Sequence, residues 1–83
     1  MIVYKDYLTF TVMGEEINLF SDEDTDYGRN TVAEINGGFH YLGDEPPGVS
    51  AAIFAWQEVY NRELSSEELH QVLVDNHLIS EAI

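Results

Sequence analysis

The stretch YLTFTVMGEEINLF, residues 7–20, decides the fold of this chain. Over Tyr7–Val12 apolar residues alternate with threonine, which is the period of two expected for a strand with one buried face. Met13-Gly14-Glu15 supplies a turn, and Glu16–Phe20 follows as a second strand. Because the connection is so short, we expect an antiparallel hairpin whose apolar faces join one core.

The next part of the chain predicts a second hairpin. Residues 21–28 are acidic with little apolar content, and we interpret them as a solvated loop. Thr31–Ile35 and Phe39–Leu42 are short strands around Asn36-Gly37-Gly38, whose Asn and Gly residues tolerate the positive φ of a tight turn. The simplest assembly is a four-stranded antiparallel meander. Residues 43–48, which contain two consecutive prolines, then end the regular strand structure.

Apolar residues recur at three- and four-residue spacing between Val49 and Asn61, which predicts an amphipathic helix with Ser50 in position to cap its start. We expect Trp56 and Tyr60 to pack in the core. Phe54 falls off the main apolar stripe, and an exposed Phe54 would be suited to anchor a partner or a homodimer.

The segment Ser65-Ser66-Glu67-Glu68 fits a capping box and predicts a second helix that runs to about Asp75. Asn76 is expected to end this helix in a left-handed conformation. The apolar residues assigned to its inner stripe, or to packing after its end, are Leu69, Val72, Leu73, Leu78 and Ile79. The fold class is therefore α+β, an antiparallel meander of about four strands followed by two helices, with residues 1–83 as one acidic domain.

The chain carries sixteen Asp and Glu against three Lys and Arg, a formal net charge of −13. Hydrophobic residues make up 45%, so a folded domain is expected in spite of the charge. An acidic surface is repelled by nucleic acid and by anionic lipid, which leaves basic proteins as the expected partners. The absence of cysteine and of an apolar stretch long enough to span a membrane leads us to expect a cytoplasmic protein.

Neither a cofactor nor a catalytic site is predicted. Alternate carboxylates over Asp22–Gly28 suggest a calcium loop, but the required glycine and the bidentate glutamate do not fall at the spacing of an EF-hand. His40, His70 and His77 are interpreted as surface or helix-end residues, because the last two lie too far apart on a helix to share one ion. No nucleophile elbow or Gly-rich phosphate loop accompanies the serines, so we expect no enzyme.

In size, charge and lack of cysteine the chain resembles the small acidic DNA mimics of phages and mobile elements, which inhibit CRISPR effectors, restriction enzymes or DNA-repair glycosylases. The resemblance implies a non-enzymatic inhibitor in the host cytoplasm that occupies the DNA- or guide-binding groove of a basic nuclease complex. The side chains expected at this interface are acidic and lie in three places: Asp22, Glu23, Asp24 and Asp26; Asp44 and Glu45; Glu67 and Glu68.

Three other interpretations stay open. An acidic immunity protein or antitoxin would neutralise a basic toxin by electrostatic steering and capping of its active site. A small subunit, dimeric if Phe54 is exposed, would add an acidic surface to a larger assembly. An ordinary domain with a solvated acidic face is the remaining interpretation.

Overall fold

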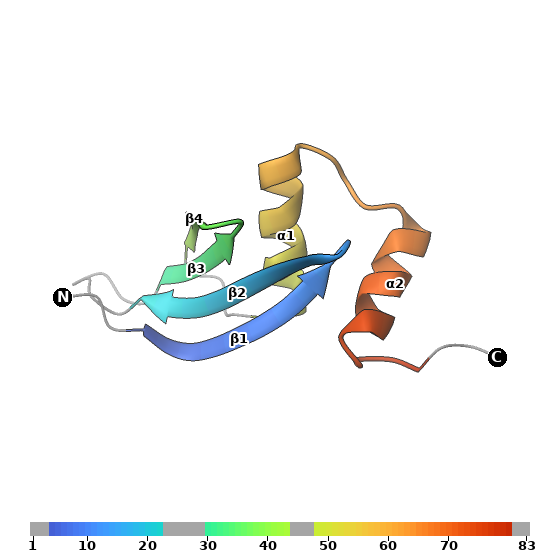
Figure 1. Ribbon diagram of the computed structural model, residues 1–83, viewed down its shortest axis with the longest axis horizontal. Helices are drawn as coiled ribbons and strands as arrows, with labels where there is room; N and C mark the ends of the chain where they lie inside the picture. The colour runs from blue at the N-terminus through green and yellow to red at the C-terminus, as the bar shows by residue number, and fades with distance from the viewer. Residues whose placement is uncertain (1–3, 23–29, 44–47, 81–83) are drawn as a thin grey trace.

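The alternating segments form a four-stranded sheet that is followed by two helices (Figure 1). The computed structural model describes residues 4–22, 30–43 and 48–80. Its elements are β1 (Tyr4–Val12), β2 (Glu15–Asp22), β3 (Asn30–Ile35), β4 (Gly38–Gly43), α1 (Val49–Tyr60) and α2 (Ser66–Asp75). Each strand pairs antiparallel with the next in the order β1-β2-β3-β4. The predicted meander, the two helices and the α+β class are confirmed.

Both described hairpins close with two-residue turns. Met13 and Gly14 have φ values of 51° and 81°, and Asn36 and Gly37 have φ values of 55° and 82°. Positive φ at both central positions is typical of the type I′ turn, whose twist matches that of the flanking strands. Asn and Gly adopt this conformation readily, whereas Met13 is strained in it, because the Cβ of most L-residues comes too close to the backbone.

One face of the sheet encloses the core together with the helices. Cross-strand register places Phe10, Ile17 and Ile35 side by side on this face. α1 crosses the sheet and packs against all four strands, whereas α2 packs mainly against the edge strand β1 (Figure 1). The buried cluster consists of Val12, Ile17, Leu19, Ala33, Ile35, Ala51, Ala52, Ala55, Trp56, Leu64 and Val72.

Two predictions for α1 are wrong. Ser50 does not cap the helix, because the N-cap residue is Gly48, whose carbonyl already accepts from the Ala52 N–H at 3.0 Å. Tyr60 is 39% exposed in the last turn, where its ring lies 5.0 Å from the Trp56 ring instead of inside the core. The core position of Trp56 is confirmed, since this side chain is 6% exposed.

The capping box of α2 is confirmed. Ser65 Oγ accepts from the Glu68 N–H at 3.2 Å, and the Ser65 N–H donates to Glu68 Oε1 at 3.0 Å. The predicted left-handed residue is wrong by one position, because Asn76 has a φ of −99° and His77 has a φ of 59°.

The apolar residues around α2 are less buried than predicted. Val72 is 1% exposed and Leu73 is half-buried, but Leu69, Leu78 and Ile79 are 38%, 49% and 39% exposed, so the predicted packing of these three is wrong. α2 contacts the sheet mainly through one edge strand, and such a contact buries a narrow stripe of the helix. Leu8 on that same edge strand is also exposed, in contrast to the buried face expected for it.

Candidate partner-binding surface

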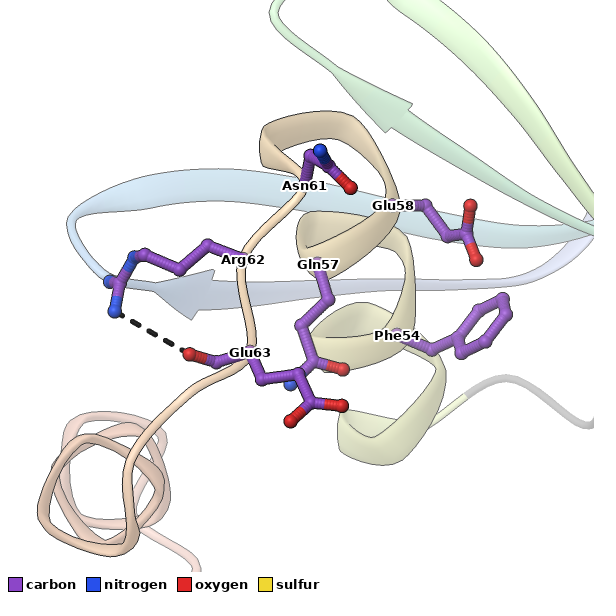
Figure 2. A pocket seen from close by; sticks show the side chains of 6 residues that line it. All are labelled: Phe54, Gln57, Glu58, Asn61, Arg62 and Glu63. Atoms are coloured by element: carbon purple, nitrogen blue, oxygen red, sulfur yellow. Dashed lines mark hydrogen bonds between the residues drawn. The ribbon is translucent and has the colours of Figure 1, made fainter.

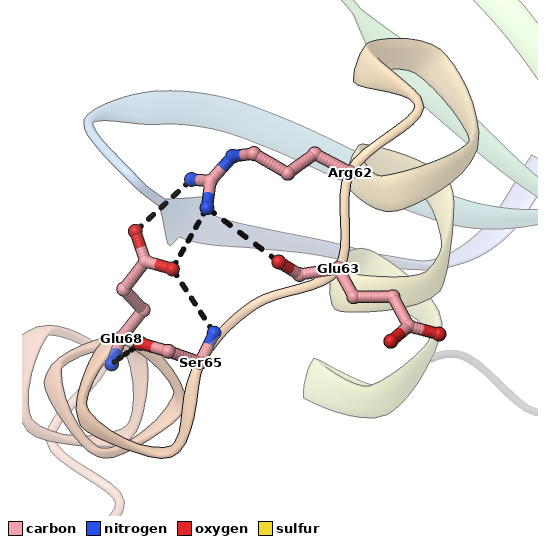
Figure 3. Close-up of polar contacts among 4 residues, drawn as sticks. All are labelled: Arg62, Glu63, Ser65 and Glu68. Atoms are coloured by element: carbon pink, nitrogen blue, oxygen red, sulfur yellow. Dashed lines mark hydrogen bonds and ion pairs between the residues drawn. The ribbon is translucent and has the colours of Figure 1, made fainter.

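Arg62, in the link between the helices, contacts Glu68 and Trp56, and its side chain is 49% exposed. Its guanidinium donates to Glu68 Oε1 at 2.9 Å and to Glu68 Oε2 at 3.0 Å, a bidentate ion pair (Figure 3). The guanidinium carbon also lies 5.1 Å from the centroid of the Trp56 ring, in reach of a cation–π interaction. Arg62 is the only Lys or Arg side chain that the structure describes, and it is already neutralised.

Glu68 has a structural role besides its predicted place at the interface. Hydrogen bonds from Arg62 and from the Ser65 N–H hold the pKa of its carboxyl at about 2, well below the usual value. A carboxylate held by both partners has little freedom to reach a third group. Glu67, its exposed neighbour in the first turn of α2, has the freedom that Glu68 lacks.

Three other carboxylates accept hydrogen bonds from neutral groups. Glu34 Oε1 accepts from Asn18 Nδ2 at 2.9 Å, and Asp75 Oδ1 accepts from Gln71 Nε2 at 2.7 Å. Glu15 accepts from the Tyr60 hydroxyl, which raises the pKa of Tyr60. These contacts orient the carboxylates and leave their charge uncompensated.

Four further carboxylates are exposed: Glu16, Glu58, Glu63 and Glu67. None of them pairs with a Lys or Arg side chain in the described part of the chain. Their negative charge is therefore presented to solvent from β2, from α1, from the link and from α2. The described acidic surface is spread over the fold.

Of the predicted interface residues, the structure describes Asp22, Glu67 and Glu68. Asp22 is the last residue of β2, where its backbone pairs with Asn30 and Tyr4, and Gly43 at the end of β4 pairs with the adjacent Thr31. The predictions for Glu23, Asp24, Asp26, Asp44 and Glu45 lie outside the described residues. Glu67 and Glu68 begin α2, at the opposite end of the molecule (Figure 1).

Phe54 on α1 contributes to the lining of two cavities. Its side chain is 50% exposed, as an interface anchor requires. One cavity of about 290 Å³ is lined by Phe54, Gln57, Glu58, Asn61, Arg62 and Glu63 (Figure 2). A second cavity of about 280 Å³ is lined by Leu42, Ser50, Ala51 and Phe54. The first offers an apolar wall beside two carboxylates, and the second connects α1 with the end of β4.

The described residues contain no group of three His, Asp or Glu side chains able to hold a metal ion. His70 and His77 are exposed, in agreement with the interpretation of them as surface residues, and His40 is half-buried on β4. The calcium interpretation of Asp22–Gly28 falls largely outside the described residues. No helix in the described ranges is long and apolar enough to cross a membrane.

Sequence reasoning missed two features of this surface. The predicted strand over residues 39–42 does not indicate which side chains face solvent, and in the structure Phe39 and Tyr41 are largely exposed on β4. The ion pair between Arg62 and Glu68 was also missed, although an arginine six residues before a capping-box glutamate is a signal that the sequence contains.

Comparison of the chain with protein-family models, with curated proteins and with solved structures gives no match.

Proposed function

We propose that this protein is a non-enzymatic inhibitor that binds a basic nucleic-acid-handling protein, of the CRISPR-effector, restriction or repair type, and keeps nucleic acid from its binding groove. The observation that carries the proposal is the uncompensated charge of −13 on a folded chain. The described arginine is already paired with Glu68, while Glu58, Glu63 and Glu67 are exposed without a described cation.

Carboxylates on a folded scaffold are suited to replace phosphates. Lys and Arg clusters that hold a nucleic acid backbone form equally short charge-assisted hydrogen bonds with carboxylates. Strands and helices fix the directions of the carboxylates in advance, so less side-chain entropy is lost on binding than with a disordered acidic tail. Such a complex forms rapidly at low salt and weakens as salt is added.

The test begins with capture from bacterial lysate on the immobilised full chain, elution by rising salt and identification by mass spectrometry. The captured protein is then purified, and its binding to a labelled DNA duplex is measured against increasing amounts of this protein. We expect a basic protein, released by salt, from which the chain and the duplex displace each other. A captured protein that binds DNA and the chain at the same time would contradict blocking of the groove.

Two variants of equal charge change locate the interface. The first reverses Asp22, Glu23, Asp24 and Asp26 to lysine, and the second reverses Glu16, Glu58, Glu63 and Asp75 to lysine. The second set is exposed, and neither set includes the Arg62–Glu68 pair. We expect the first variant to lose inhibition and the second to lose less. An equal loss would mean that long-range attraction acts without a defined acidic contact, and unchanged inhibition in the first variant would remove this segment from the interface.

A second candidate is an acidic subunit of a larger assembly, which the exposed Phe54 beside two cavities specifically favours. Replacing Phe54 by serine separates the two functions. An assembly anchored by this ring would dissociate, whereas binding driven by charge would persist with a moderate loss. Capture of a single toxin that is indifferent to DNA would point instead to an antitoxin.

A further inference from the structure

The outer edge of β4 has no neighbouring strand in the described part of the chain. β4 ends the sheet order, and among the described residues it pairs with β3 alone. The pair Ile35 and Gly38 flanks a two-residue turn and is therefore a hydrogen-bonded pair of the ladder. Because hydrogen-bonded and non-hydrogen-bonded pairs alternate, the peptide N–H and C=O groups of Phe39 and Tyr41 point away from β3, toward the outer edge.

The opposite edge supports this assignment. By the same alternation from its own two-residue turn, Thr11 of β1 directs its peptide groups outward. The Thr11 N–H donates to Asn76 Oδ1 at 2.8 Å, and the Thr11 carbonyl accepts from Asn76 Nδ2 at 2.8 Å. The outward groups of β1 are thus hydrogen-bonded at this position, while those of Phe39 and Tyr41 have no partner among the described residues.

Aromatic side chains line the β4 edge on the face of the sheet away from the helices. Phe39 and Tyr41 are 53% and 62% exposed. Glu34 is the cross-strand neighbour of Phe39 and lies on the same face. An arginine or lysine on an added strand would place its stem against these rings and its charge near the Glu34 carboxylate.

An apolar cavity lies on the helix side of β4. Leu42, Ala51 and Phe54 contribute to the lining of its volume of about 280 Å³, which is sufficient for an aliphatic side chain. Glu58 follows Phe54 by one helical turn, and Figure 2 shows both side chains directed to the same side of α1. An added strand would therefore meet an apolar pocket on this side, and Glu58, which lines the neighbouring cavity, lies one turn further along α1.

We propose that the outer edge of β4 accepts an extended segment of the basic partner as a fifth strand, in which arginine or lysine alternates with apolar residues. Main-chain hydrogen bonds to Phe39 and Tyr41 hold the segment, and the two sides of the edge select its alternating side chains. A second copy of this chain is disfavoured as occupant, because each copy carries a charge of −13. The inference rests on the proposed function for the charge of the partner.

The edge available to this segment is short. Leu42 is an extra residue between the pairs Val32–Tyr41 and Thr31–Gly43, and Gly43 has a φ of 83°. Such a bulge bends the strand and interrupts the row of outward groups. The main-chain hydrogen bonds therefore fall within Gly38–Tyr41, and the pocket lined by Leu42 lies at the end of this stretch.

The probe is a synthetic peptide of about eight residues in which arginine and valine alternate, a length typical of a strand. Amide hydrogen exchange of the full chain is followed by NMR with and without this peptide. We expect exchange at Phe39 and Tyr41 to slow by about tenfold or more, with no change at Thr11, which is already bonded. Control peptides replace arginine by glutamate, or keep the composition with arginine and valine in separate blocks.

Two variants at one position isolate the backbone contribution. Tyr41→Pro removes an outward N–H without removing a donor to β3, and we expect about tenfold weaker peptide binding. Tyr41→Thr keeps the N–H and the preference for a strand, so the protection of residue 41 should persist. Circular dichroism of each variant confirms that the domain is folded.

Peptide binding without protection of Phe39 and Tyr41, equal affinity of the two variants, or no binding of the alternating peptide would each overturn the β4 inference. A dimer with β4 amides protected in sedimentation and exchange experiments without peptide would assign the edge to a second copy and overturn it too. None of these results touches the proposed function, whose test is displacement by DNA. The chain and DNA could also fail to displace each other while the peptide still protects the β4 amides. The protein would then be a module that binds a strand of another basic protein.

Discussion

The two edges of the sheet differ in the hydrogen bonding of the outward peptide groups at Thr11, Phe39 and Tyr41. On β1, the side chain of Asn76 hydrogen-bonds both outward peptide groups of Thr11, at 2.8 Å each, across 65 residues of sequence. On β4, the outward groups of Phe39 and Tyr41 meet no described strand or side chain. Natural sheets protect their edges against unwanted pairing, and this difference between Thr11 and the β4 residues is the reason why we assign recognition to β4 in our proposal.

The largest effect is expected when the hydrogen bonds between Asn76 and the edge of β1 are removed. Asn76→Ala deletes the bonds to the Thr11 N–H and carbonyl and a third bond, from Nδ2 to the Val72 carbonyl at 2.7 Å. Since each such bond contributes about 1 kcal/mol and the Thr11 groups are partly buried, we expect a loss of about 2–3 kcal/mol in the free energy of unfolding, measured in urea. Gln71→Ala, which removes an exposed bond on the same helix, should change it by about 0.5 kcal/mol or less. Equal effects of the two substitutions would contradict a special role for Asn76.

Proline at equivalent positions compares the two edges directly. Thr11→Pro deletes the donor to Asn76 Oδ1 and leaves that oxygen unpaired, so we expect a loss of about 2 kcal/mol in the free energy of unfolding. Tyr41→Pro deletes an N–H that faces solvent, and we expect a loss of about 1 kcal/mol or less. Urea unfolding of both variants gives the comparison. A larger loss at Tyr41 would mean that its N–H belongs to the ladder with β3.

The two turns offer a smaller contrast. Met13 has a φ of 51° at the position where the second hairpin has Asn36 with a φ of 55°. Because asparagine tolerates this conformation better, Met13→Asn should raise the free energy of unfolding by about 0.5–1 kcal/mol. Asn36→Met should lower it by a similar amount. Thermal unfolding of both variants measures the pair, and destabilisation by Met13→Asn would show that the 39% exposed Met13 side chain contributes packing that outweighs its strain.

Features that depend on neighbours in sequence could be predicted, and those that depend on distant contacts could not. The first hairpin, the Asn36-Gly37 turn and the Ser65–Glu68 capping box follow from local spacing, and all three are present. The bonding of Asn76 to Thr11 has no local signal, because the periodicity of a helix does not show which strand its end approaches. The exposure of Leu69 has the same origin, since only the tertiary arrangement shows that α2 rests on a single edge strand.

The proposed acidic interface is the part of the molecule that the sequence predicts least. Composition indicates a basic partner, but net charge carries no direction. Glu67 and Glu68 look equivalent in sequence, whereas in the fold Arg62 and Ser65 hold Glu68 and leave Glu67 exposed. A capping box identifies the glutamate that caps, so the sequence alone could have assigned the capping role to Glu68 and left Glu67 free of it.

The smallest effect is expected at the start of α2, whereas the largest is expected at Asn76, just after the end of this helix. Arg62 and the Ser65 N–H lower the pKa of Glu68 from 4.5 in the unfolded chain to about 2 in the fold. The ionised carboxylate therefore stabilises the fold above pH 4.5, and this contribution is lost as the pH falls from 4.5 toward 2. We expect Glu68→Gln to lower the melting temperature at pH 7 and to match the original chain near pH 2.

Glu67→Gln is the matched control, because Glu67 is an exposed carboxylate in the same helical turn. Other acids titrate in every variant, so the informative quantity is the difference in melting temperature between each variant and the original chain. This difference should shrink with acid for Glu68→Gln and stay small at every pH for Glu67→Gln. A difference for Glu68→Gln that is constant from pH 7 to pH 2 would mean that the capping geometry stabilises α2 without help from the charge of Arg62.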